Sequence, residues 1–168
     1  MFACSKQDGK VPASDISLKD EIRPDQISYD TEVAFVDSSF TKAILEAGRA
    51  RVFNKEQETL LDSSVKVTFF DRDNPNKISI LTCDSARIDD KTKNMIAKGN
   101  VVVISDSQNM KLETSLLEWK NDKQRLYSTE FVKITTEHEI LKGYGFESDP
   151  DLKDYKIFKV SGSQNIRR

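Results

Sequence analysis

The chain has 168 residues, enough for one domain, since domains commonly contain about 100–150 residues. Its 26 Lys and Arg residues nearly balance 28 Asp and Glu residues, and the formal net charge of -2 argues against a nucleic-acid partner. Bilayer spans need roughly 18 consecutive apolar residues. The longest purely apolar run here is Val101–Ile104, so no stretch of this sequence resembles a transmembrane helix.

Residues 1–25 have the composition of an anchor followed by a flexible tether. Met1-Phe2-Ala3-Cys4-Ser5 resembles the end of a bacterial lipoprotein signal, in which a small residue precedes the cysteine that is lipidated. Lys, Asp, Ser, Gly and two prolines follow up to Asp25, as in flexible linkers. We expect Cys4 to carry a lipid anchor; an unpaired cysteine in a frayed terminus is the alternative.

Beyond the tether, apolar residues recur at every second position in short runs, which predicts strands rather than helices. Four runs share one spacing of two, three and then two residues: Leu45-Ala47-Ala50-Val52, Leu81-Cys83-Ala86-Ile88, Leu112-Thr114-Leu117-Trp119 and Leu141-Gly143-Phe146-Ser148. The step of three moves the inward-facing apolar side chains from odd to even positions, or the reverse, midway along the strand. This step indicates a β-bulge that bends each of these template strands at the same place.

Each template strand is followed by a return strand with its own matching pair: Val65 and Val67, Val101 and Val103, Val132 and Ile134, and Phe158 and Val160. Val33 and Phe35 indicate a leading strand of the same type, and polar turns join the strands. The sequence therefore predicts an all-β domain over residues 26–163, with an open, curled antiparallel sheet of about nine strands. Residues 164–168 are expected to form a disordered tail. The free edges of such a sheet favour a partner that adds a strand.

Few side chains suit catalysis or metal binding. His138, the single histidine, lies in a polar stretch between two expected strands, so a solvated turn is favoured over a general base or metal ligand. The stretch Asp71–Asn76 lacks the glycine and the distal glutamate of a calcium loop. Cys83 occupies a position that other small residues fill in the other repeats, so packing explains it. We expect no enzyme activity, no cofactor and no metal.

The C-terminal segment is distinctive. Gly143-Tyr144-Gly145-Phe146-Glu147-Ser148-Asp149, followed by Asp151, Leu152, Tyr155, Ile157, Val160 and Gly162, resembles the closing signature of the periplasmic C component of the lipopolysaccharide-export ABC transporter. Residues 81–86, 99–101, 117–119 and 130–134 fit the same family, so the similarity covers roughly residues 33–162. The resemblance implies a twisted β-jelly roll that joins related domains edge to edge.

The resemblance also implies a function. The protein would accept lipopolysaccharide from the inner-membrane ABC transporter and pass it along a hydrophobic groove to the next periplasmic carrier. Its partners would be the lipid A acyl chains, the transporter permeases and a soluble carrier paired at an edge strand. Many relatives are anchored by a transmembrane helix, and here Cys4 would tether the protein to the periplasmic face of the inner membrane. A soluble periplasmic lipid carrier or an envelope adhesion module is the alternative.

We expect acyl chains to contact the inward positions near the middle and end of the sheet: Ala86, Ile88, Val101, Val103, Leu117, Trp119, Val132, Ile134 and Phe146. Shielding is the physical task, because an exposed acyl chain of about 14 carbons costs on the order of 10 kcal/mol at about 0.8 kcal/mol per methylene. Simple core packing explains each of these positions equally well. Gly143 and Gly145 are expected to be structural glycines near a partner edge.

Overall fold

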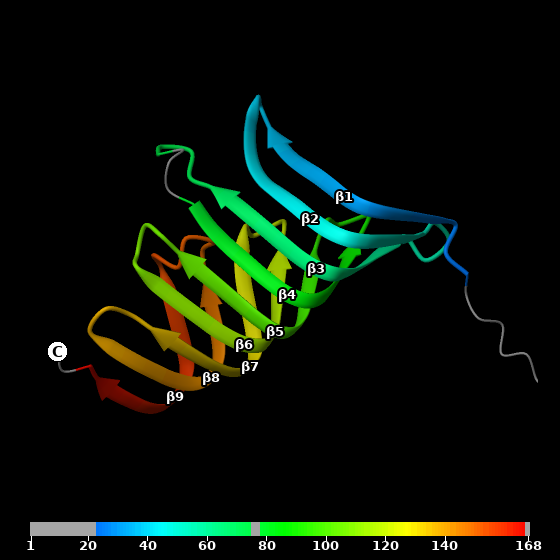
Figure 1. Ribbon diagram of the computed structural model, residues 1–168. Helices are drawn as coiled ribbons and strands as arrows, with labels where there is room; N and C mark the ends of the chain where they lie inside the picture. The colour runs from blue at the N-terminus through cyan, green and yellow to red at the C-terminus, as the bar shows by residue number, and fades with distance from the viewer. Residues whose placement is uncertain (1–22, 75–77, 167–168) are drawn as a thin grey trace, which may run out of the picture.

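The computed structural model describes residues 23–74 and 78–166, and these residues form nine strands and no helix. The strands are β1 (Gln26–Asp37), β2 (Phe40–Phe53), β3 (Glu58–Phe70), β4 (Ile78–Asp89), β5 (Met95–Ser105), β6 (Met110–Lys120), β7 (Arg125–Thr135), β8 (Glu139–Ser148) and β9 (Tyr155–Asn165). They form one antiparallel sheet in sequence order (Figure 1). The predicted all-β fold with an open sheet is confirmed.

The ends of the sheet bear on the expected domain limits. β1 begins at Gln26. β9 includes residues 164 and 165, which were expected to belong to the tail, because Gln164 pairs with Ile140 and Asn165 pairs with Glu139. Cys4 and the tether up to residue 22 lie outside the described residues.

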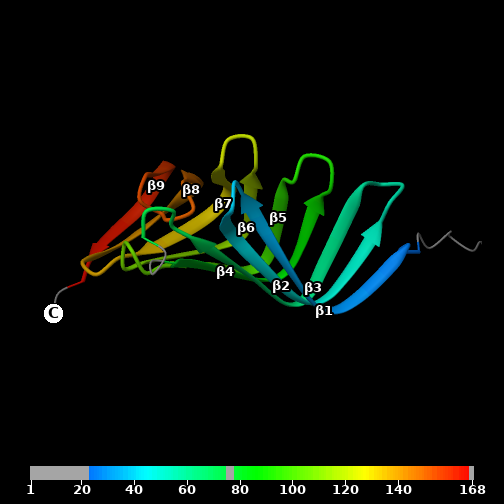
Figure 2. The ribbon, with the colours of Figure 1, turned by 90° about the horizontal axis from the view of Figure 1, so that it is seen from above.

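The curled sheet forms a trough with two walls (Figures 1 and 2). We define the first wall as the half of the sheet that ends in the turns 38–39, 106–109 and 136–138. The second wall ends in the turns 54–57, 90–94 and 121–124 and in the β8–β9 loop, residues 149–154. Every strand therefore contributes one half to each wall.

The walls meet where the strands bend, and each bend coincides with a register shift. Shifts lie at the same level in every pair from β2–β3 to β7–β8. In the template strand β4 the buried positions step by three, from Cys83 to Ala86. In the return strands they step by four, as from Leu61 to Val65 and from Ala97 to Val101.

The position of the bulge differs from the expectation. At each shift the extra residue lies in β3, β5 or β7, the return strands, rather than in the template strands. The reason is local conformation, because Ser63 and Ser64 in β3 and Gly99 and Asn100 in β5 have positive φ angles. A residue in this conformation is what a bulge adds to a strand, and the result is a bend with a stronger twist.

One continuous cluster of buried side chains fills much of the space between the two walls. It is made largely of template and return positions, such as Leu81, Leu112 and Val103, which are at most 1% exposed. The last strand departs from the repeat: Phe158 and Val160 are 57% and 60% exposed, and Tyr155 and Ile157 pack against the cluster instead. Among the described residues β9 pairs with a strand on one side alone, and these two side chains are left exposed at that edge.

Gly99 provides a test of the bend. Its φ is 76°, and a Cβ added there would collide with the carboxylate of Asp84. We expect Gly99→Ala to lower the free energy of unfolding by about 1–3 kcal/mol, because a side chain strains the left-handed conformation. The corresponding fall in melting temperature is several degrees, measured by circular dichroism.

Gly162→Ala is the matched control, because a Cβ there meets no atom within 4 Å. This variant should melt close to the parent. Equal melting temperatures for the two variants would contradict the importance of the bulge at Gly99.

Candidate functional site

A pocket of about 400 Å³ opens in the trough beneath its N-terminal strands. The first wall contributes the end of β1, the start of β2 and the end of β3, and the second wall contributes the end of β4, the start of β5 and the end of β6. The apolar lining residues are Phe35, Val36, Phe40, Ala43, Leu45, Val67, Phe69, Phe70, Ile88, Met95 and Trp119. This volume lies at the lower end of the roughly 300–1,000 Å³ typical of ligand sites, and the lining suits an apolar ligand.

Two contacts join the walls at this pocket. The rings of Phe69, on the first wall, and Trp119, on the second, have centroids 6.0 Å apart and are tilted by 44°. The Lys42 ammonium donates a hydrogen bond to Gln124 Oε1 at 3.4 Å. A long, exposed hydrogen bond contributes little to stability. These two contacts add only a little to the packing of the buried side chains that also joins the walls.

Charged side chains surround the apolar interior. Lys42 forms an ion pair with Asp37 at 2.8 Å, and the hydrogen bond from Lys42 lowers the pKa of the Asp37 carboxyl. The Arg72 guanidinium carbon lies 6.0 Å from the centroid of the Phe40 ring, a cation–π distance. Lys93 also lines the pocket, as do Asp71 and Asp151. An apolar interior beneath a charged rim fits an amphiphile whose head group is charged.

The β8–β9 loop crosses from the second wall to the first. Two buried serines of the first wall hold it: the Ser105 hydroxyl donates to the Asp151 carbonyl at 2.6 Å, and the Ser79 hydroxyl donates to Asp151 Oδ1 at 3.3 Å. Both serines are 0% exposed. The next residue, Leu152, is 1% exposed and belongs to the buried cluster. The loop thus spans the trough, and its Pro150 and Asp151 line one side of the pocket.

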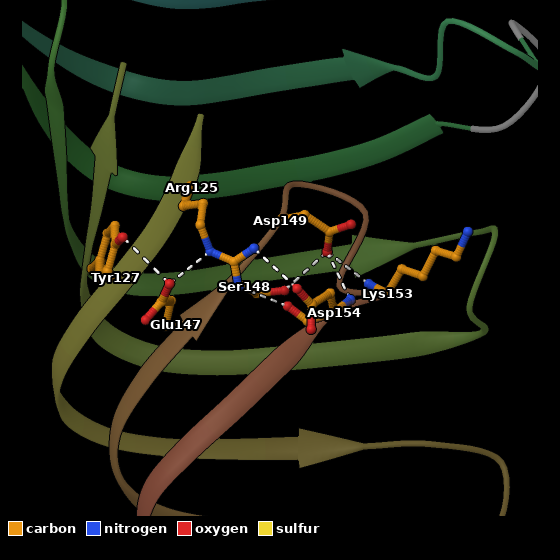
Figure 3. A network of polar contacts seen from close by, with 7 residues as sticks. All are labelled: Arg125, Tyr127, Glu147, Ser148, Asp149, Lys153 and Asp154. Carbon is orange, nitrogen blue, oxygen red and sulfur yellow. Dashed lines mark hydrogen bonds and ion pairs between the residues drawn. The ribbon is translucent and has the colours of Figure 1, made fainter. Parts of the chain in front are cut away.

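Polar contacts shape the base of this loop (Figure 3). Asp149 Oδ1 accepts hydrogen bonds from the backbone N–H groups of Lys153, at 2.8 Å, and Asp154, at 3.1 Å. Arg125 forms ion pairs with Glu147 at 2.7 Å and with Asp154 at 3.1 Å. The loop is therefore a preformed turn that is attached to β7 and β8 independently of its contacts with the first wall.

Burial raises the pKa of Asp151, and the nearby carboxylates of Asp71 and Asp149 raise it further. The hydrogen bond from Ser79 acts in the opposite direction. Because folded Asp151 binds a proton more readily than the unfolded chain does, protonation favours the folded loop. This contribution is present at low pH and is lost as the pH rises through the raised pKa.

The structure places all nine predicted lipid-contacting residues on the inner side of the trough. Ile88 and Trp119 line the pocket. The other seven are at most 5% exposed and lie within the buried cluster: Ala86, Val101, Val103, Leu117, Val132, Ile134 and Phe146. The pocket itself lies nearer the beginning of the sheet than these positions do.

The phenylalanines that line the pocket were not among the predicted site residues. Phe40, Phe69 and Phe70 stand outside the repeated spacing and close to the connections between strands. Their clustering at neighbouring strand ends is the signal that could have identified them. Gly143 and Gly145 lie in β8, beside the edge strand β9, where a Cβ on Gly143 would collide with Ile157.

The remaining polar candidates have structural explanations. His138 is exposed, and its backbone joins the β7–β8 turn to the chain end through a hydrogen bond from the Ile166 N–H group. Burial raises the pKa of the Cys83 thiol to about 11, which disfavours the reactive thiolate. Across residues 23–74 and 78–166, no group of three or more His, Cys, Asp or Glu side chains is placed to hold a metal ion.

A family model described as lipopolysaccharide-assembly, LptC-related, matches residues 3–162. The chain belongs to this family. Membership indicates a role in lipopolysaccharide transport. Proteins of this family are periplasmic components associated with the inner membrane and with the transporter complex. A comparison with curated proteins finds no match. In the part of the chain that the structure describes, no helix is long and apolar enough to cross a membrane.

Proposed function

We propose that this member of the LptC-related family is a bridge protein that accepts lipopolysaccharide from the inner-membrane ABC transporter and passes it to the next periplasmic β-jelly-roll carrier. The observation that carries the proposal is the apolar pocket between the two walls, in a chain of a lipopolysaccharide-assembly family. Acyl chains would enter this pocket, and the sugars would remain in water.

The hydrophobic effect supplies the driving force. An acyl chain of about 14 carbons in water costs on the order of 10 kcal/mol, at about 0.8 kcal/mol per methylene, and lipid A has several chains. A wall of Phe, Val and Trp side chains offsets this cost without directional bonds, so the lipid can slide. Lys42, Arg72 and Lys93 line the pocket beside Asp37, Asp71 and Asp151, so a head group that carries charge would meet side chains of both signs. Direction would come from ATP hydrolysis in partner subunits.

The contacts between the walls support entry from the side. Separating the walls at the pocket would break the Phe69–Trp119 contact and the long Lys42–Gln124 hydrogen bond. It would also break the two serine hydrogen bonds that hold Asp151 to the first wall, unless the loop stays behind. An arriving acyl chain would replace the aromatic contact with its own apolar surface. Opening would break no backbone hydrogen bonds between strands. Each strand pairs with its neighbours within the sheet, and no strand pair joins the two walls across the mouth of the trough.

The outer edges of β1 and β9, which pair with no other strand in residues 23–74 and 78–166, support partner binding by strand addition. Tyr29 and Ile27 in β1 are 71% and 49% exposed, and Phe158 and Val160 in β9 are exposed to a similar extent. Apolar side chains on both outermost strands are suited to continuing the sheet into neighbouring domains. One edge would meet the transporter, and the other would meet the soluble carrier.

The first test places a photo-crosslinking residue at Trp119, which lines the pocket, and at Lys133, which is paired with Glu113 at 3.0 Å and does not line it. We expect several-fold more lipopolysaccharide adduct at Trp119 than at Lys133 while the transporter hydrolyses ATP. Immunoblotting for lipopolysaccharide gives the readout. Equal labelling at both positions would eliminate the groove assignment.

The second test addresses the edges. A photo-crosslinker at Tyr29 in β1 or at Val160 in β9 should capture a protein partner in intact cells. Ile104, which is 46% exposed on the interior strand β5, is the control with similar apolar exposure. Mass spectrometry of the adducts should give different partners for the two edges. Recovery of the same partners from Ile104 would argue against strand addition.

The third test concerns attachment to the membrane, for which we propose Cys4 as the lipid-bearing residue. A lipoprotein cysteine carries several acyl chains, and stable anchoring needs more than one such signal. Cys4→Ala should move the protein from the membrane fraction to the soluble periplasmic fraction, with Cys83→Ala as the control for loss of a cysteine. A Cys4→Ala protein that still sediments with membranes would disprove the lipid anchor.

A further inference from the structure

The β8–β9 loop divides the interior of the trough. The loop leaves the second wall at Ser148 and reaches two strands of the first wall, β4 at Ser79 and β5 at Ser105. On one side of it lies the pocket, which Pro150 and Asp151 line. Leu152 follows directly and is packed in the buried cluster that continues to Phe146 and Tyr155.

The loop differs from the rest of the core in how it is held. The sheet is fixed by continuous strand pairing, whereas the tip of the loop is attached to the first wall by two serine hydroxyls and the burial of one leucine side chain. Its base is fixed separately by Asp149 and by the ion pairs of Arg125. Leu152 is also joined to the base, because its N–H group donates a hydrogen bond to the Asp149 carbonyl at 3.2 Å. The tip can therefore leave the first wall without the loss of a strand pair, but the turn at Asp149 moves with it.

The size of the pocket suggests why such a movement would help the proposed cargo. About 400 Å³ lies at the lower end of the range for a single small ligand, whereas lipid A has several acyl chains. A chain that advanced from the pocket toward β9 would meet the loop tip. The Leu152 side chain is a short branched alkane. It therefore fills its place in the buried cluster with the same kind of apolar surface that an acyl chain has.

We propose that the β8–β9 loop is an internal plug, and that the place of Leu152 in the trough is a second acyl-chain site, which opens when the loop tip leaves Ser79 and Ser105. This inference rests on the proposed function. Lipid in the pocket would displace the tip, and the plug would return after the lipid has passed. Between transport events the plug keeps the apolar interior near β9 closed to water.

The test uses tryptophan fluorescence in the full chain, with dibromostearate as a quenching probe and unbrominated stearate as the control ligand. Trp119 is the single tryptophan and reports on the pocket. A second reporter, Trp119→Phe with Tyr155→Trp, reports on the region beyond the plug, because the Tyr155 ring stacks on buried Phe146 at 6.4 Å. Ser79→Cys together with Asp151→Cys is designed to lock the plug to the first wall through a disulfide. Cys4→Ala and Cys83→Ala remove the other two cysteines of the chain.

We expect dibromostearate to quench Trp119 in both the locked and the reduced protein. The second reporter should be quenched in the reduced protein and protected severalfold by the lock. Removing both loop-holding hydroxyls, with Ser79→Ala and Ser105→Ala, should increase its quenching severalfold. Ser161→Ala with Ser163→Ala, two exposed serines of β9, should leave it unchanged.

Two results together would overturn the plug. One is equal quenching of the second reporter in locked and reduced protein, and the other is unchanged quenching after the loss of the Ser79 and Ser105 hydroxyls. The proposed function would survive that result if Trp119 is still quenched. Absence of quenching at Trp119 would instead overturn the pocket as an acyl-chain site, and the plug with it. The two failures are therefore distinguishable.

Discussion

Three interior strands, β3, β5 and β7, carry an extra residue at one level of the sheet, and this local mismatch with their neighbours shapes the whole molecule. A strand with regular pleating would give a gently twisted sheet with two solvent-exposed faces, on which the apolar side chains of the template strands could not all be buried. The mismatch turns the strand, so that its two halves face each other. The core of the protein is then the space between the halves of one sheet, and no second sheet or helix is needed in the described residues to cover it.

Under the proposed function, stability and lipid binding would compete for the same side chains. Val103 and Leu117 are almost completely buried, so lipid can reach them only when the walls separate. Trp119 and Ile88 are less completely buried and line the pocket, although the Trp119 ring still contacts Phe69 on the first wall. A chain with a more complete core would be more stable, but it would offer less room for an acyl chain. The β8–β9 loop relieves this conflict, because a removable side chain stabilises the interior in the absence of lipid.

Much of the fold could be predicted from the sequence, because it follows from local rules. The spacing of Leu81, Cys83 and Ala86 determines which face of the strand is buried, and the polar turns determine where each strand ends. The strand that carries the bulge could not be read from this spacing, since Ser63 and Ser64 adopt positive φ without a glycine to mark them.

The site was predictable in its character but not in its position. An apolar inward face follows from alternation. The place where the walls part depends on how far Phe69 and Trp119 approach across the trough, and no local pattern specifies a contact between residues so distant in the chain. The role of Leu152 was hidden for the same reason, because a single leucine between Asp and Lys reads as part of a polar turn.

The order of the strands in the sheet is the order of the sequence, so every strand pairs with its neighbours in the chain alone. A molecule built in this way is close to a one-dimensional array, in which stability is a sum of unit and neighbour contributions. Its length is then an adjustable quantity: because strands lie about 4.8 Å apart, duplication of one hairpin would lengthen the trough by about 10 Å without a new type of contact. The length of such a trough could thus evolve by gene duplication of hairpins, separately from the side chains that line it.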